Sequence, residues 1–215
     1  MKRSKLVALC ICAALILTVT VIGTLAYLTS QSEVENTFTV GKVNITLDET
    51  AVNEDGTAIV GANRVKENDY HLIPGQTYIK DPTLTVEADS EDCYVRMLLT
   101  INCADAFDAI YSPEKADLTT LFNGYDAGNW IFESVTREND ELTYEFRYKE
   151  IVGNSDTDVV LDALFDSITV PGEYDGEDME SISGLKITVV GHAIQAVGFA
   201  DEDEAWEAFD EQIDG

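Results

Sequence analysis

The residue types that most often perform catalysis are few in this sequence, and they do not form a known catalytic motif. The chain has two histidines, His71 and His192, and it contains no HExxH zinc motif. Nucleophile elbows of the G-x-S-x-G type and phosphate-binding loops are also absent from the sequence. His192 lies in an apolar run, which favours a packed histidine over a metal ligand. We therefore expect no enzymatic activity, no catalytic residue and no bound cofactor.

Acidic residues suggest a second chemistry, the binding of Ca²⁺. Three residues have the spacing of the first ligands of an EF-hand loop: Asn154, Asp156 and Asp158. The sixth position is Val159 rather than glycine and the twelfth is Phe165 rather than glutamate, so an EF-hand is excluded. Asp156 is instead predicted to cap a short helix over residues 159–165. The acidic loop 173–178 could hold a calcium ion weakly because its charge density is high.

The charge of the chain limits its partners. The sequence has 41 acidic and 13 basic residues and a net charge of −28. Residues 1–26 contain three of the basic residues and none of the acidic ones, so the remainder carries about −31 (10 − 41). Such a surface repels phosphates and anionic lipid, so we expect no nucleic-acid partner.

The N-terminal residues have the pattern of a secretory signal. Three cations precede an unbroken apolar run over residues 6–22: Lys2, Arg3 and Lys5. Small residues follow, with Thr24 and Ala26 at the −3 and −1 positions of a signal-peptidase site. We predict a signal peptide over residues 1–26 that is cleaved between Ala26 and Tyr27. The alternative is an uncleaved membrane anchor, since 17 apolar residues (22 − 6 + 1) approach the length of a membrane span.

The chain after the cleavage site begins with two strand patterns that meet at Gly41. The larger apolar residues occupy even positions before Gly41 and odd positions after it: Leu28, Val34, Phe38 and Val40, then Val43, Ile45 and Leu47. Because side chains alternate between the faces of a strand, this change requires a bend, which glycine can supply. Residues 27–41 are therefore predicted to be an N-terminal strand that can pair outside its own domain, with Gly41 as the hinge.

The rest of the chain is mostly β-prone. Short alternating runs predict strands over residues 78–86, 93–103, 130–135, 142–148, 168–170 and 185–199. Helices are predicted over residues 104–123, 159–165 and 202–213. These elements indicate an antiparallel β-sandwich over residues 42–200 with short helical inserts, followed by an acidic C-terminal helix over residues 201–215.

Two cysteines, Cys93 and Cys103, lie outside the signal peptide and bracket one predicted strand. A strand of that length spans about 33 Å, whereas a disulfide needs Cα atoms within about 7 Å. We therefore expect two buried thiols rather than a disulfide.

Six short motifs are distributed along the chain: GTLAYLT at 23–29, NTFTVGKVNI at 36–45, PG at 74–75, KDPTLTV at 80–86, YVRM at 94–97 and AIQAVGF at 193–199. They resemble motifs of the exported matrix proteins of Gram-positive bacteria that the SipW-type signal peptidase processes, the TasA, camelysin and BsaA-like family. Leu28 replaces the phenylalanine that is commoner in the family. The motifs are spread along the chain from residue 23 to residue 199.

The resemblance implies a sandwich of jelly-roll type and a secreted protein of the biofilm matrix or cell surface, processed by a SipW-type peptidase. After cleavage we expect no stable membrane insertion. We expect a homopolymer in which each subunit donates its N-terminal strand to the next, with Val34, Phe38 and Val40 as contacts. Such head-to-tail contacts do not close and give fibres. The alternatives are a camelysin-like metallopeptidase, which the missing zinc ligands disfavour, and a calcium-dependent adhesion module.

Overall fold

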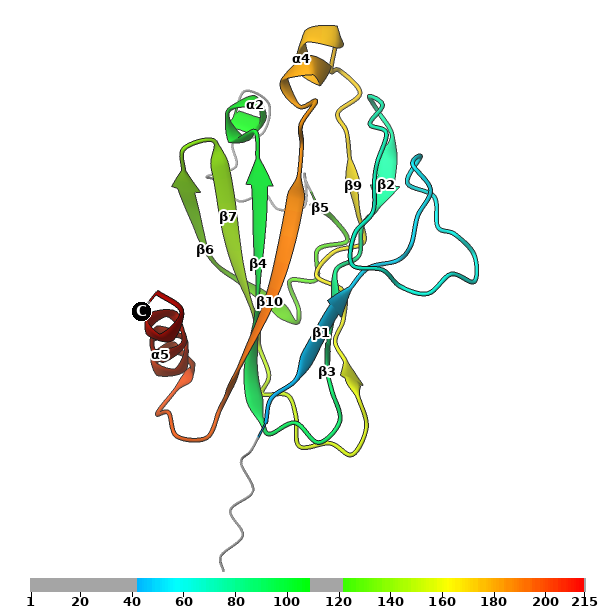
Figure 1. Cartoon of the computed structure of the whole chain (residues 1–215). Helices are drawn as coiled ribbons and strands as arrows, with labels where there is room; N and C mark the ends of the chain where they lie inside the picture. The colour runs from blue at the N-terminus through cyan, green and yellow to red at the C-terminus, as the bar shows by residue number, and fades with distance from the viewer. Residues whose placement is uncertain (1–41, 109–121, 215) are drawn as a thin grey trace, which may run out of the picture. The chain divides into compact units, whose positions relative to one another are not determined.

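The computed structural model describes residues 42–108 and 122–214 (Figure 1). Its largest sheet has four antiparallel strands in the order β10-β4-β7-β6. These strands are β4 (Cys93–Asn102), β6 (Trp130–Glu138), β7 (Glu141–Tyr148) and β10 (Ile187–Gln195). The hairpin of β6 and β7 and the strand that begins after residue 92 agree with the sequence predictions.

Two three-stranded antiparallel sheets complete the β-structure. One has the order β1-β3-β8 and the other β2-β9-β5. Their strands are β1 (Ile45–Asp48), β2 (Thr77–Ile79), β3 (Thr83–Val86), β5 (Phe122–Asn123), β8 (Val159–Val160) and β9 (Ser167–Thr169).

Buried side chains from all three sheets form one core. Every second residue of β4 points inward and is almost fully buried: Val95, Met97, Leu99 and Ile101. Aromatic rings join the layers, since the ring of Phe122 in β5 lies 6.2 Å from that of Tyr144 in β7. The predicted mainly β antiparallel sandwich with short helical inserts is confirmed.

Three helices lie among the described residues: α2 (Ala104–Asp108), α4 (Gly176–Ser181) and α5 (Glu202–Asp214). None of these is long and apolar enough to span a membrane. The acidic C-terminal helix is confirmed. The predicted loop 173–178 is wrong in part, because Asp175 accepts hydrogen bonds from the backbone nitrogens of Glu177 and Asp178 and so caps α4.

The predicted helix over residues 159–165 is wrong. Val159 and Val160 form strand β8, in which Val159 pairs with Val86 of β3. Two β-branched residues favour a strand, and the free edge of β3 provides the partner. Asp156 therefore caps no helix there. The helix predicted over residues 104–123 is confirmed only at its start, where α2 forms, and its last two residues are strand β5; residues 109–121 lie outside the described part.

Cys93 and Cys103 are both free and lie at opposite ends of β4, as the sequence predicted. Cys93 is fully buried as expected, but the expected burial of Cys103 is wrong in part, because this residue follows the last residue of β4 and is only half-buried.

Candidate functional site

The candidate site is formed by two sheet edges that face each other. β10 is one of the two outer strands of the four-stranded sheet, and β1 is one of the two outer strands of a three-stranded sheet. Within residues 42–108 and 122–214, β10 pairs only with β4, and β1 pairs only with β3. An edge strand presents unpaired backbone groups that can accept another strand.

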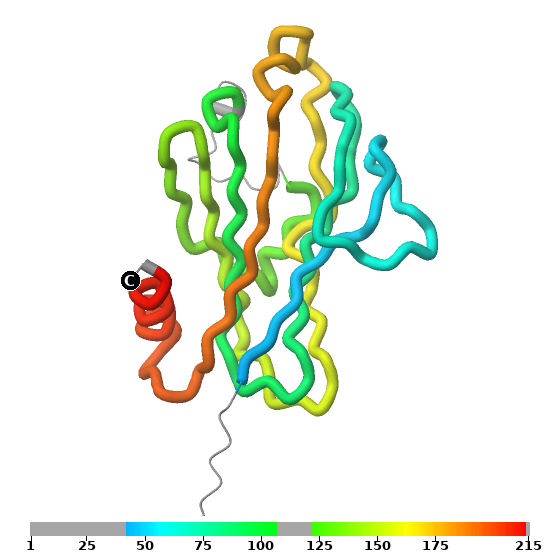
Figure 2. The backbone as a smooth tube through the Cα atoms, viewed as in Figure 1, coloured from blue at the N-terminus to red at the C-terminus, as the bar shows by residue number. Residues whose placement is uncertain are grey.

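These two edges are close at one point and separate from there. At Gly191 in β10, an added Cβ atom would lie 2.7 Å from Leu84 Cδ1 and 3.7 Å from Ile45 Cδ1. The segments of β1 and β10 diverge toward the start of β10 (Figure 2). The sandwich is therefore closed near Gly191, where β10 passes close to the side chain of Leu84, and open near residue 185.

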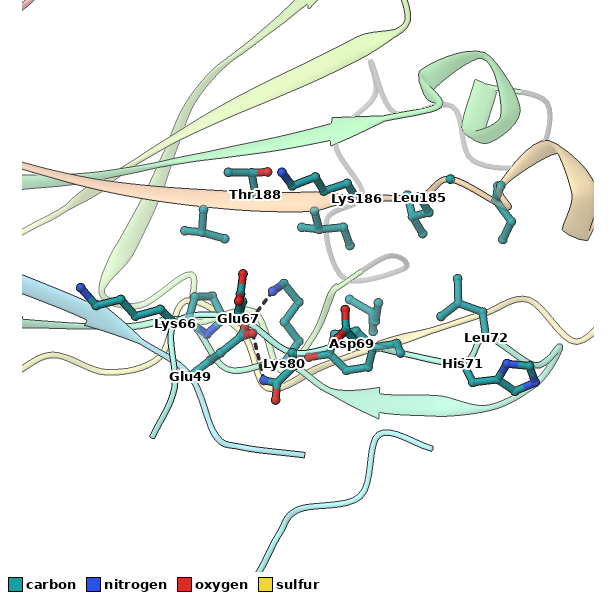
Figure 3. Close-up of a pocket in the computed structure, with 18 of the residues that line it drawn as sticks. Glu49, Lys66, Glu67, Asp69, His71, Leu72, Lys80, Leu185, Lys186 and Thr188 are labelled. Carbon is teal, nitrogen blue, oxygen red and sulfur yellow. Dashed lines mark hydrogen bonds and ion pairs between the residues drawn. The ribbon is translucent and has the colours of Figure 1, made fainter. Parts of the chain in front are cut away.

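A groove of about 990 Å³ occupies the open part (Figure 3). One wall is the start of β10 with the residues that lead into it, and the other wall is the segment 66–72. Leu185 and Leu72 extend toward each other from these two walls (Figure 3). The groove also reaches the end of α4 at Met179.

Apolar side chains line the groove without being fully buried. The half-buried members are Leu47, Tyr70, Leu72, Met179, Leu185, Ile187 and Val189. Burial of apolar surface is favourable by about 25 cal/mol per Å². An apolar segment that enters the groove would therefore gain free energy by covering these side chains.

The floor of the groove carries a buried ion pair. Lys80 Nζ donates to Glu49 Oε2 at 2.7 Å, and the two residues are only 8% and 6% exposed. Glu49 Oε1 also accepts a hydrogen bond from Asn68 Nδ2 at 3.0 Å. Both carboxylate oxygens therefore have a donor, as a buried charge requires.

Asn68 connects one wall of the groove to the chain that follows β1. Its Nδ2 donates to the carbonyl of Thr50 at 2.9 Å, and its Oδ1 accepts from the backbone nitrogen of Val52 at 3.0 Å. The neighbouring Tyr70 donates from its hydroxyl to the carbonyl of Ile79 at 3.0 Å. Burial, with the nearby Glu49 charge, raises the pKa of Tyr70, so the phenol stays protonated. These bonds fix the segment 66–72 in the position that forms the groove.

Charged side chains surround the mouth of the groove. Lys66 and Lys186 are exposed cations on opposite walls, and Glu67 and Asp69 are exposed acids beside Lys66. In the part of the chain that the structure describes, neither lysine forms an ion pair. Both ammonium groups are therefore available to an incoming segment.

The structure does not describe the residues that the sequence singled out for cleavage and strand donation. Ala26, Tyr27, Val34, Phe38, Val40 and Gly41 lie outside the described residues. Their roles remain predictions. The groove itself was not predicted, although the apolar alternation of residues 185–189 marked one of its walls.

No group of three or more metal-ligating residues gathers in residues 42–108 or 122–214. His192 Nδ1 accepts a hydrogen bond from Arg96 Nε at 3.2 Å, and its ring lies 4.8 Å from that of Phe209. Burial, with the Arg96 charge, lowers the pKa of His192 and favours its neutral form. His71 is exposed at the groove.

Sequence reasoning missed the contacts that hold helix α5 on the outer face of the four-stranded sheet. The Arg96 guanidinium is 3% exposed and donates two hydrogen bonds to the carboxylate of Asp210. Its central carbon lies 4.4 Å from the ring centroid of Trp206 and 5.2 Å from that of Phe209. The available signal was the apolar stripe of α5, which must cover a surface; its partner could not be read from the sequence.

Comparison with protein-family models, curated proteins and solved structures finds no match. The family resemblance therefore rests on the sequence motifs alone.

Proposed function

We propose that this protein is a secreted structural subunit that assembles into extracellular fibres by strand donation. After cleavage behind Ala26 by a SipW-type peptidase, residues 27–40 of one copy would enter the groove of the next copy. The single observation that carries this proposal is the groove between the edges of β1 and β10, lined by half-buried apolar side chains.

The composition of residues 27–40 suits such a groove. Val34, Phe38 and Val40 recur on one face of an extended strand, and the 14 residues (40 − 27 + 1) would span about 46 Å. Main-chain hydrogen bonds to a free sheet edge would provide affinity, and the apolar side chains would provide selectivity.

The positions of the two features support a head-to-tail arrangement. The described chain begins at Lys42, whose carbonyl accepts a hydrogen bond from the backbone nitrogen of Glu91 at 2.9 Å, near the start of β1. The groove is lined in part by Met179 of α4, and α4 lies at the opposite end of the sandwich from the start of β1 (Figure 1). If the groove of one copy holds the N-terminal strand of another, the two surfaces differ and the contact is heterologous, which extends into a filament.

Removal of residues 27–40 tests the proposal. We expect the protein that lacks them to stay soluble and folded and to form no fibres, by light scattering and electron microscopy at equal concentration. Phe38→Asp should have nearly the same effect, because a carboxylate would be placed among the half-buried apolar side chains that line the groove. The matched control is Thr39→Asp, which places the same charge on the opposite face and should still assemble. Fibres from the truncated protein would exclude strand donation by this segment.

A further inference from the structure

We propose that Lys186 selects the register of the donated strand by pairing with Glu33 or Glu35 of the incoming copy. This inference rests on the proposed function, and it names the charged contact that specifies how the donor sits in the groove.

Lys186 is an exposed cation with a fixed backbone. Its backbone nitrogen donates to Asn102 Oδ1 at 2.6 Å, and its carbonyl accepts from the Asn102 backbone nitrogen at 3.3 Å. Lys186 and Thr188 lie on one side of the chain that forms the groove wall, whereas Leu185 extends from the other side into the groove (Figure 3). Its ammonium group has no ion-pair partner in the described part of the chain.

The donor segment carries its charge on the matching face. Glu33 and Glu35 are the only charged residues in 27–40, and both occupy odd positions. Side chains on adjacent strands share faces, so a donor that directs Val34 and Phe38 into the groove places both glutamates on the same face as Lys186. A cross-strand pair of opposite charge is then within reach.

The other cations near the groove are less suited to bind the donor glutamates. Arg64 is already paired with Asp48 at 2.5 Å, and Lys80 is paired with Glu49. Lys66 lies on the opposite wall with Glu67 and Asp69 next to it in sequence. Lys186 is the cation on the wall whose edge strand is free within residues 42–108 and 122–214, so it is the one placed beside a strand added to β10.

This lysine would restrict the register of the donor. A shift of the donor by one residue turns the glutamates into the groove, and a shift by four residues moves both glutamates away from Lys186. A shift by two residues can exchange Glu33 for Glu35, so Lys186 restricts the donor to the registers that place one of these glutamates beside it.

A charge exchange tests this inference in the mature chain that begins at Tyr27. Lys186→Glu alone, and Glu33→Lys with Glu35→Lys alone, should each raise the protein concentration needed for fibre formation by about 3- to 10-fold. The combination of all three substitutions should restore assembly to within about twofold of the wild type. The control is Lys149→Glu, which makes the same charge change at an exposed lysine after β7, outside the groove, and should assemble like the wild type.

The possible results distinguish failure of the Lys186 contact from failure of strand donation. If Lys186→Glu assembles like the wild type, or if the charge exchange does not restore assembly, Lys186 does not select the register. Strand donation would still hold in that case, provided that removal of residues 27–40 abolishes fibres. High salt should reduce the difference between Lys186→Glu and the wild type, because it screens exposed charges.

Discussion

Lys80 Nζ lies 2.7 Å from Glu49 Oε2, and this buried pair joins the chain that follows β1 to the chain that follows β2. The contact lies beneath the groove, so it links the stability of the sandwich to the shape of the candidate site. A buried ion pair stabilises little compared with apolar residues of the same size, but loss of one partner leaves an uncompensated charge.

Removal of one partner should therefore cost more than removal of both. We expect Lys80→Met to lower the free energy of unfolding by about 3–5 kcal/mol, measured by urea denaturation. The double variant Lys80→Met with Glu49→Leu should recover most of this loss. Equal destabilisation of the single and double variants would show that the charge left behind is not the cause.

Two glycines with similar φ angles allow the energetic cost of backbone strain to be measured separately from the cost of steric overlap. Gly56 and Gly61 have φ values of +76° and +80°. A Cβ atom at Gly56 would lie 2.7 Å from Tyr78 Cα, whereas nothing lies within 4 Å of one at Gly61. Gly61→Ala should cost about 1–2 kcal/mol for the backbone conformation alone, and Gly56→Ala should cost about 1–3 kcal/mol more. Similar unfolding free energies for the two variants would contradict this account.

Acid should weaken the attachment of α5. The hydrogen bond from Arg96 lowers the pKa of Asp210, so the stability that this carboxylate contributes is lost as the pH falls through its folded-state pKa. Burial lowers the pKa of His192, so the unfolded state binds a proton more readily, and stability falls as the pH drops below about 6.5. Both groups act in the same direction.

The histidine part of this effect can be measured alone. Between about pH 7 and pH 5, where Asp210 stays ionised, the wild type should lose stability to urea and His192→Gln should lose less. Asp210→Asn should destabilise the protein at neutral pH while leaving the His192 titration in place. A wild type and a His192→Gln variant with the same pH dependence would show that His192 does not contribute.

The two thiols should differ in reactivity. Burial, with the Asp92 charge, raises the pKa of Cys93 to about 11. Burial also raises the pKa of Cys103, but this side chain is only half-buried. At about pH 8 an aromatic disulfide reagent should modify Cys103 slowly and Cys93 hardly at all, because the thiolate is the reactive form. Both should react in urea. Fast modification of Cys93 in folded Cys103→Ser would contradict the prediction.

Cleavage between Ala26 and Tyr27 predicts the first residue of the exported protein. N-terminal sequencing should begin at Tyr27, because Thr24 and Ala26 are small enough for the peptidase subsites. Exported protein that retains Met1 would contradict a cleaved signal.

The sequence alone determined the features that depend on local periodicity. The alternation of Val95, Met97, Leu99 and Ile101 predicted β4 and its buried face, because side chains in a strand point to opposite faces in turn. The apolar residues Trp206, Phe209 and Ile213 recur with helical periodicity along one side, and this pattern predicted α5. The distance between the ends of β4 was enough to predict free thiols.

Only the tertiary structure decided which distant residues meet. Lys80 and Glu49 are 31 residues apart and Arg96 and Asp210 are 114 apart, so no local pattern reports either contact. The helix predicted at Val159 became strand β8 because the edge of β3 supplied a partner that outweighs local preference. The groove depends on the same kind of long-range relationship. The groove lies where β10, which is close to Leu84 at Gly191, faces the segment 66–72 at Leu185, six residues earlier.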